Sequence, residues 1–158
     1  MLLLRPALKY TFPVSLIVRP ATDHDLPNLQ PVNLSAKETL RKFYHRHESV
    51  PQLEEYHPTT LVIAEIHGQL VGRCEYRILG NELYFLALGV LEGHRRQGVL
   101  RKMFEFFESL AMLEKCEKIT CETIAETGNR EIFEKLGMNV VRSSPSAKYV
   151  APDEKPVL

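Results

Sequence analysis

The sequence has 158 residues, of which 44% are apolar and 25% are charged, a balance typical of one soluble globular domain. Its 20 basic and 20 acidic side chains cancel, which argues against a protein that binds nucleic acid or an anionic membrane surface through its overall charge. Three cysteines without C-x-x-C spacing, and the lack of any apolar run long enough for a signal peptide or a membrane span, predict a cytoplasmic protein with reduced thiols.

The first part of the chain is expected to hold one strand and two helices. Residues 1–14, a short apolar run broken by prolines, are predicted to be an N-terminal extension. Residues 16–19 have the composition of a buried strand. The sequences TDHD at residues 22–25 and SAKE at residues 35–38 match capping boxes, and the second is expected to open a longer helix. Residues 49–58, which contain two prolines, are expected to form a loop.

The middle of the chain is rich in predicted strands. Apolar and β-branched residues indicate strands at 61–66 and 70–76, joined by a turn at His67–Gly68. A second tight turn at Gly80–Asn81 leads into residues 83–90, which are almost wholly apolar. Such a run is typical of a central strand that is covered on both faces.

Helical periodicity returns at residue 99. Apolar residues from Val99 to Leu113 recur at helical spacing, and residues 118–124 are predicted to form a further strand. A short helix that Thr127 caps and Gly137 ends would follow, and then closing strands at 138–141 and 148–150 and a tail at 152–158. The order of elements predicts a single domain at residues 15–151 with a mixed sheet flanked by helices, which is α/β or α+β by class.

Residues 83–107 carry the strongest functional signal. A buried strand is followed by a basic loop, and a helix begins directly after Gly98. The N-terminus of a helix presents unpaired N–H groups and suits a diphosphate, and Gly98 lets the backbone approach a ligand closely. The same pattern also fits a helix opened by glycine with solvated arginines. It matches neither the dinucleotide fingerprint nor a Walker loop.

The loop sequence RRQGV at residues 95–99, five residues after Val90, resembles the acyl-CoA signature [Q/R]-x-x-G-x-[G/A] of the GCN5-related N-acetyltransferases. Residues 16–27 are similar to that family's first strand and helix start, residues 66–72 to its second hairpin, and residues 132–138 to its late Y-E-K-x-G-F helix. The resemblance covers roughly residues 15–150. It implies an α/β (α+β) fold with a mixed, mostly antiparallel sheet of six to seven strands flanked by about four helices.

The resemblance further implies acetyl-CoA or another acyl-CoA as co-substrate, and transfer of the acyl group to an amine of a small molecule or peptide. In the family, main-chain amides of the loop and helix start hold the pyrophosphate, the pantetheine arm pairs with the end of the fourth strand, and the late helix flanks the thioester. The residues that would bind acyl-CoA are therefore Leu88, Gly89, Val90, Arg95, Arg96, Gln97, Gly98, Val99, Leu100, Arg101, Asn129 and Phe133.

Two positions depart from the family pattern. Leu100 stands where the family has glycine or alanine, and its side chain points either into the core or toward the phosphate contacts. Phe133 stands where many members have a tyrosine that protonates the leaving thiolate. Water, Tyr84 or Tyr149 would then have to serve. Both departures favour an alternative in which the chain is an acyl-CoA-binding sensor or partner domain without turnover.

The attacking amine must be neutral, so a base or a water chain has to accept its proton. Glu82 and Tyr84 share one face of the strand by alternation and are the predicted catalytic pair, with Glu75 on the neighbouring strand as a third candidate. Each carboxylate alone also fits a solvated strand end. A backbone N–H near Val90 is the expected donor to the carbonyl oxygen.

Metal and macromolecular partners are not expected from the sequence. His45 and His47 face different sides of a helix, and no carboxylate completes a ligand set with them, so no metal site is predicted. Nucleic acid and membranes are excluded as partners on the charge and hydropathy given above. A homodimer is left open, because no motif decides the oligomeric state.

Overall fold

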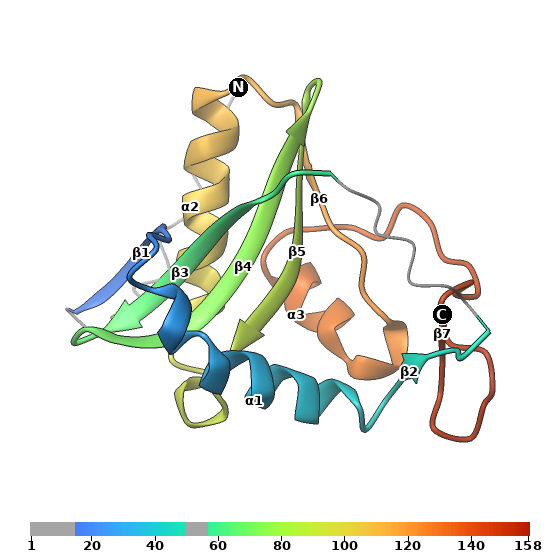
Figure 1. Cartoon of the computed structure of the whole chain (residues 1–158). Helices are drawn as coiled ribbons and strands as arrows, with labels where there is room; N and C mark the ends of the chain where they lie inside the picture. Colours follow the sequence, from blue (N-terminus) through green and yellow to red (C-terminus); the bar gives the residue numbers. More distant parts are fainter. Residues whose placement is uncertain (1–14, 50–56) are drawn as a thin grey trace.

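The structure is a computed structural model that describes residues 15–49 and 57–158. The predicted extension at residues 1–14 and most of the predicted loop at 49–58 lie outside these ranges. The described elements, labelled in Figure 1, are β1 (Leu16–Pro20), η1 (Leu26–Asn28), α1 (Gln30–Leu40), β2 (His45–Arg46), β3 (Thr60–Ile66), β4 (Gln69–Leu79), β5 (Glu82–Val90), η2 (Glu92–His94), α2 (Val99–Leu113), β6 (Lys118–Thr120), η3 (Ala125–Thr127), α3 (Asn129–Lys135) and β7 (Tyr149–Val150).

Five strands form one sheet in the order β1-β3-β4-β5-β6, and β2 and β7 form a separate two-stranded sheet. All neighbours in the main sheet are antiparallel except β5 and β6, which are parallel. The predicted mixed, mostly antiparallel sheet is confirmed. The described strands are divided between two sheets, and the described residues form three α-helices and three short 3-10 helices, roughly consistent with the expected number of about four helices.

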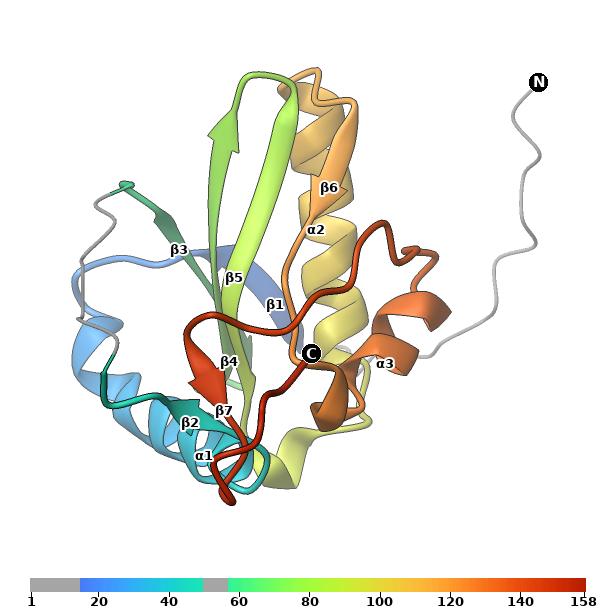
Figure 2. The same ribbon diagram turned by 90° about the vertical axis from the view of Figure 1, so that its right-hand side faces the viewer.

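The two longest helices cover opposite faces of the main sheet, as Figures 1 and 2 show from perpendicular directions. Helix α2 buries Met103 and Phe107 against the sheet, where the ring of Phe107 stacks on that of Phe85 with centroids 5.4 Å apart. Fully burying one such aromatic side chain contributes about 1.5–3 kcal/mol. Helix α1 crosses only the lower end of the other face in Figure 1. The core therefore lies between the sheet and α2.

The predicted start of helix α1 is wrong. The helix begins at Gln30 rather than near Ser35, because Pro31 occupies the first turn, where its fixed φ and missing N–H are tolerated. Ser35 lies inside the helix, and its hydroxyl accepts a hydrogen bond from the N–H of Glu92 at 3.1 Å instead of capping. The box at residues 22–25 keeps half of its predicted pattern, since the Asp25 carboxylate accepts the N–H of Thr22 at 2.7 Å.

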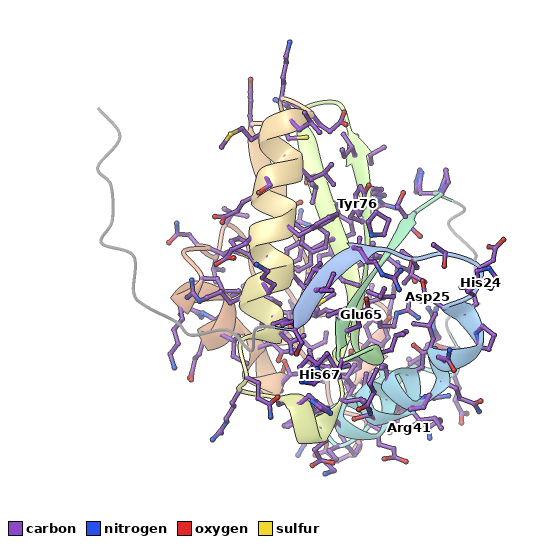
Figure 3. All side chains as sticks on the ribbon, turned by 90° about the vertical axis from the view of Figure 1, so that its left-hand side faces the viewer. His24, Asp25, Arg41, Glu65, His67 and Tyr76 are labelled. Carbon is purple, nitrogen blue, oxygen red and sulfur yellow. The ribbon has the colours of Figure 1, made fainter. Side chains whose placement is uncertain are left out.

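Asp25 is also the centre of an ion-pair network that fixes β1. The Arg19 guanidinium donates to both Asp25 oxygens, at 2.8 and 2.9 Å, and contacts Glu65 on β3. Asp25 and Glu65, both labelled in Figure 3, lie at the edge of the sheet that β1 forms. Because Arg19 hydrogen-bonds the buried Asp25 carboxylate, the pKa of that carboxyl lies well below its usual range. This network joins the first strand to the turn that leads into α1.

The last third of the chain is less regular than predicted. Strand β6 ends at Thr120 rather than at residue 124, and residues 138–141 form no strand. The reason is tertiary, because the side chain of Val141 is 94% exposed and the chain there pairs with no neighbour in the described structure. Strand β7 pairs with β2 instead of with the main sheet. Gly137 does end α3 in the left-handed conformation, as predicted, with φ of 97°.

The final residues pack against the domain. Val157 is 1% exposed, Pro156 forms a bridge with Val150, and the carbonyl of Leu158 accepts the N–H of Ala125 at 2.7 Å. Residues after 151 therefore contribute to the folded unit. The domain boundaries at residues 15 and 151 stay predictions.

Candidate active site

Strands β5 and β6 form a fork. They pair in parallel from Glu82 with Lys118 to Tyr84 with Thr120, and no further pair follows. The chain after β6 then runs away from β5 toward η3 (Figures 1 and 2). On its other edge β5 stays paired with β4 as far as Val90 with Gly72. Residues 85–90 of β5 therefore have one closed edge and, among the described residues, one open edge.

The same stretch of β5 has a β-bulge on its paired edge, against β4. Glu75 pairs with Leu86 and Arg73 with Gly89, so β5 holds one more residue than β4 between these pairs. Ala87 lies in this stretch with φ of +52°, a conformation that costs a residue other than glycine on the order of 1–3 kcal/mol. Bulges bend a strand and redirect its side chains, and they are frequent beside functional sites.

The backbone of Val90 points into the open edge. Leu91 donates its N–H to the carbonyl of Val71 on β4 at 2.8 Å. Because successive residues of a strand direct their backbone groups to opposite sides, the N–H and C=O of Val90 point away from β4. The Val90 carbonyl accepts a hydrogen bond from Arg95 Nε at 3.1 Å, whereas its N–H has no acceptor in the described part of the chain. A main-chain donor is thus available where β5 ends.

The N-terminus of α2 lies directly after this point. Gly98 is the N-cap, with φ of +82° and no side-chain cap, and the first helical bond runs from the N–H of Lys102 to the Gly98 carbonyl at 3.0 Å. Within the described ranges the N–H groups of residues 96–100 have no acceptor. Arg96 also has a positive φ, of +62°. Successive N–H groups in such a turn, added to the helix dipole, form an anion-binding concavity.

Arg95 has a structural part in this loop. Its Nε binds the Val90 carbonyl, and its Nη2 donates to Thr39 Oγ1 on α1 at 3.0 Å. The side chain therefore fixes the loop to β5 and α1, and the backbone N–H of Arg95 donates to the Glu92 carbonyl at 3.3 Å. Arg96 and Gln97 are exposed, and Arg101 is half-buried on the first turn of α2.

Two glycines bring helices close to this end of the sheet. A Cβ on Gly89 would lie 2.9 Å from the Cβ of Ala36 on α1. A Cβ on Gly72 would lie 3.1 Å from Val99 Cγ1 in the first turn of α2. The side chain of Leu100, the departure from the family signature, packs against the core rather than pointing toward the phosphate contacts. Leu88 also contacts the core.

Helix α3 contributes its aromatic residue to the core. The ring of Phe133 is 9% exposed and meets Phe85 edge-on, with centroids 5.8 Å apart. The N–H of Asn129, at the start of the helix, donates to Thr127 Oγ1 at 3.3 Å. The position where a family tyrosine would stand is thus occupied by a packed hydrocarbon ring.

The predicted catalytic pair lies at the closed end of the fork. Glu82 accepts hydrogen bonds from Thr120 Oγ1 and from Lys118 Nζ, the latter at 2.9 Å. The Thr120 hydroxyl and then Lys118 lower the pKa of the Glu82 carboxyl. Eight residues separate Glu82 from Val90, roughly 26 Å along a strand. Tyr84, the last paired residue, is nearer to the open edge, and burial raises the pKa of its phenol.

A row of charged side chains on β4 is the feature that sequence reasoning largely missed. Arg73, Glu75 and Arg77 alternate on the face that α1 partly covers. Arg73 donates to Glu75 and, at 2.9 Å, to Asn33 on α1, while Thr59 donates to Glu75 at 2.8 Å. The guanidinium carbon of Arg77 lies 4.8 Å from the centroid of the Tyr84 ring. The sequence signal that could have indicated this row is the alternation of charged residues inside an otherwise apolar strand.

Other regions offer less chemistry. The imidazole of His45 pairs with Glu154 at 3.0 Å, and no cluster of three metal-binding side chains is found among the described residues. A groove of about 650 Å³ between the start of α1 and the β3–β4 turn has no titratable side chain in its lining. None of the described helices has the length and apolar character needed to cross a membrane.

Comparison with known proteins agrees with this geometry. The model of the Acetyltransferase (GNAT) family matches residues 28–138. A PaiA N-acetyltransferase from Thermoplasma acidophilum, solved with coenzyme A, is 12% identical with a TM-score of 0.66, over 85% of this chain and 96% of that one. The ribosomal-protein-S18-alanine N-acetyltransferase of Escherichia coli is 14% identical with a TM-score of 0.63, over 90% and 88%.

A putative streptothricin acetyltransferase from Bacillus anthracis str. Ames, in complex with acetyl coenzyme A, is 18% identical with a TM-score of 0.59, over 79% of this chain and 82% of that one. At such identities these structures establish the shared fold. No curated protein sequence matches the chain. The family match spans well over half of the residues and includes the fork, the loop and the start of α2, and the chain accordingly belongs to the GNAT acetyltransferase family.

Proposed function

We propose that this protein transfers an acetyl or other short acyl group from acyl-CoA to an amine of a small molecule or peptide. The observation that carries the proposal is the coincidence of two main-chain features at one end of β5. These are the N–H of Val90 on the open edge and the unpaired N–H groups of residues 96–100 at the start of α2. One suits an amide or thioester oxygen, and the other suits a diphosphate.

The residues present fit acyl-CoA. The loop and the first turn of α2 would hold the diphosphate through the amides of residues 96–100, and Gly98 keeps that surface free of a side chain. The end of β5 at Leu88, Gly89 and Val90 would pair with the pantetheine amides along the open edge. Asn129 and Phe133 on α3 would flank the thioester, with Phe133 acting through packing.

For the chemical step, we assign the base to Glu75 in preference to Glu82. The Glu75 carboxylate is held by Arg73 and Thr59 beside Leu86, one residue before the bulge. Glu82 is bound by two partners at the far end of the strand, and its lowered pKa makes it a weaker base. In the reaction the amine nitrogen attacks the thioester carbon, its proton passes to Glu75, and the C–S bond breaks.

The developing oxyanion and the leaving thiolate also need partners. We assign the role of donor to the carbonyl oxygen to the N–H of Val90, and its direction toward the open edge supports this assignment. For the thiolate we propose water as the proton donor, because Tyr84 lies six positions before Val90, roughly 20 Å along the strand. Tyr84 lies at the fork between β5 and β6, where the open edge begins.

A catalytically silent acyl-CoA sensor is the second candidate, because Phe133 offers no proton to a thiolate. Calorimetry with CoA and acetyl-CoA, combined with a thiol-release assay over a panel of amines, separates the two functions. Turnover well above the uncatalysed rate supports the transferase. Tight CoA binding without release for any amine supports the sensor, and no binding of either nucleotide overturns both.

A further inference from the structure

Arg77 on β4 has no direct ion pair with a described carboxylate, although its charge acts on Glu82, which Thr120 and Lys118 bind. Its side chain is half-buried with the guanidinium over the Tyr84 ring, and it forms no hydrogen bond or ion pair with any described residue. Its Nε is fully buried and has no acceptor. A buried donor without an acceptor costs about 1–3 kcal/mol, and the planar guanidinium presents paired donors suited to a carboxylate or phosphate.

The neighbouring charges are already balanced. Arg73 is paired with Glu75, and Glu82 is paired with Lys118. Glu122, on the exposed chain after β6, acts on the Tyr84 phenol and raises its pKa without forming an ion pair with Arg77. The charges named here sum to zero, and Arg77 is the cation among them that no described carboxylate contacts directly. A positive group at this point repels acceptors that carry several ammonium groups and attracts acceptors that carry an anion.

The position of Arg77 sets the distance between the two ends of such an acceptor. Arg77 pairs with Tyr84, and the bulge at Ala87, next to the Leu86 that pairs with Glu75, lies three residues farther along β5. Three residues of strand span roughly 10 Å. The length of the Arg77 side chain shortens the distance between its guanidinium and the bulge. An acceptor that reaches both points must have its anion several bonds away from its reactive amine.

We propose that the acceptor is an amine that also carries an oxyanion, a carboxylate or a phosphate, and that Arg77 binds this anion and thereby determines acceptor specificity. The proposal rests on the acyltransferase function proposed above. It separates this chain from transferases of polycationic acceptors that share the fold.

Four acceptors of matched length test the proposal: 6-aminohexanoate, 6-aminohexyl phosphate, hexylamine and 1,6-diaminohexane. We expect kcat/KM with at least one of the two anionic amines to exceed that with hexylamine at least tenfold, and the diamine to be the poorest acceptor. The ratio of the two anionic amines tells a carboxylate from a phosphate. A preference for the diamine, or equal values for all four, would overturn the proposal.

Variants assign the preference to Arg77. Arg77→Gln should reduce the preference for the anionic amine at least tenfold while leaving the Kd for CoA unchanged, and Arg77→Lys should retain part of it because the charge remains. Lys155→Gln, at a side chain that is 77% exposed, is the control and should keep the wild-type preference. An undiminished preference in Arg77→Gln would contradict the assignment.

A binding measurement keeps the two proposals apart. If no amine is acylated, the proposed function fails, and calorimetry of 6-aminohexanoate and 6-aminohexyl phosphate with the CoA-loaded protein then tests Arg77 directly. Binding to wild type that is lost in Arg77→Gln supports an anion site in a protein without turnover. Equal binding to both proteins, or no binding to either, refutes the anion site itself.

Discussion

The two ends of the β5–β6 fork differ in how fully their polar groups are satisfied. At the closed end, Glu82 is held by Lys118 and Thr120, and the strands form a regular parallel ladder. At the open end, the N–H groups of Val90 and of residues 96–100 have no acceptor among the described residues, and Ala87 adopts a costly backbone conformation. Both ends belong to one nine-residue strand with one hydrophobic core behind it.

Chemistry is therefore expected at the open end of the fork, where polar groups are left unsatisfied. A carboxylate on the strand is a weak indicator when its hydrogen bonds are complete, as for Glu82. Unsatisfied donors and local strain at the open end are better indicators, because folding alone does not account for them. Position selects Glu75 over Glu82 as base, since both carboxylates have two partners and Glu75 is the one that lies beside the bulge.

Glu75→Gln tests the comparison with the largest expected effect. Loss of the base should lower kcat for the best acceptor about a hundredfold or more, measured by steady-state thiol release. Glu82→Gln is the matched control, because the same substitution at the closed end should leave kcat within about twofold. The opposite pattern would move the chemistry to the closed end of the fork.

Gly98→Asp tests the anion site of the open end. A carboxylate there repels a diphosphate, and the left-handed conformation costs about 1–2 kcal/mol for a side chain, so the Kd for CoA should rise about a hundredfold. Calorimetry measures the change. Gly80→Asp is the control: Gly80 has φ of +59° with open space around it, and it lies at the far end of β5. CoA affinity equal to wild type in Gly98→Asp would show that the site lies elsewhere.

Phe133→Tyr asks whether the open end lacks only a phenol. Because the Phe133 ring is buried against Phe85, the added hydroxyl should lose its hydrogen bonds to water and lower the free energy of unfolding by about 1–2 kcal/mol, without raising turnover. Denaturant unfolding and the thiol-release assay measure both quantities. Phe106→Tyr, at a half-buried ring, is the control and should be nearly neutral. A faster Phe133→Tyr enzyme would mean that thiolate protonation limits the reaction.

Glu82→Gln should have the smallest effect on stability, about 0.5 kcal/mol at pH 7, because the ion pair with Lys118 is partly exposed. The pKa of Glu82 is lower in the folded state than in the unfolded chain, so its contribution is complete above pH of about 4.3 and is lost as the pH falls through the folded-state pKa. Unfolding curves of wild type and variant should therefore converge in acid. A gap that widens in acid would contradict the lowered pKa.

Much of the fold could be predicted from the sequence because its elements are locally determined. The apolar runs of β3 and β5, the helical period of α2 and the turn at Gly80–Asn81 each carry their own signal. The strand predicted at residues 138–141 is wrong. An apolar run forms a strand only if a neighbouring strand pairs with it, and Val141 is exposed instead. The capping-box pattern at residues 35–38 predicts a later start for α1 than the structure has, whereas Pro31 is the residue that marks the actual first turn.

The candidate site divides in the same way. The loop at residues 95–98 and the end of β5 could be predicted because they form one contiguous motif. The bulge at Ala87 and the isolation of Arg77 could not, because both depend on the register between strands and on which partners other elements supply. Pairing across a sheet is a relation between distant segments that no local pattern contains.

The glycines at positions 72 and 89 have a consequence for how such a protein can change. At each position the lack of a Cβ lets a helix lie close to the sheet, α2 at Gly72 and α1 at Gly89. The depth at which α2 settles on the sheet therefore sets where its N-terminus lies relative to the end of β5. A single methyl group added at Gly72 would retune nucleotide affinity from inside the protein, so natural variation or engineering has a route to altered binding strength that leaves every ligand-touching residue intact.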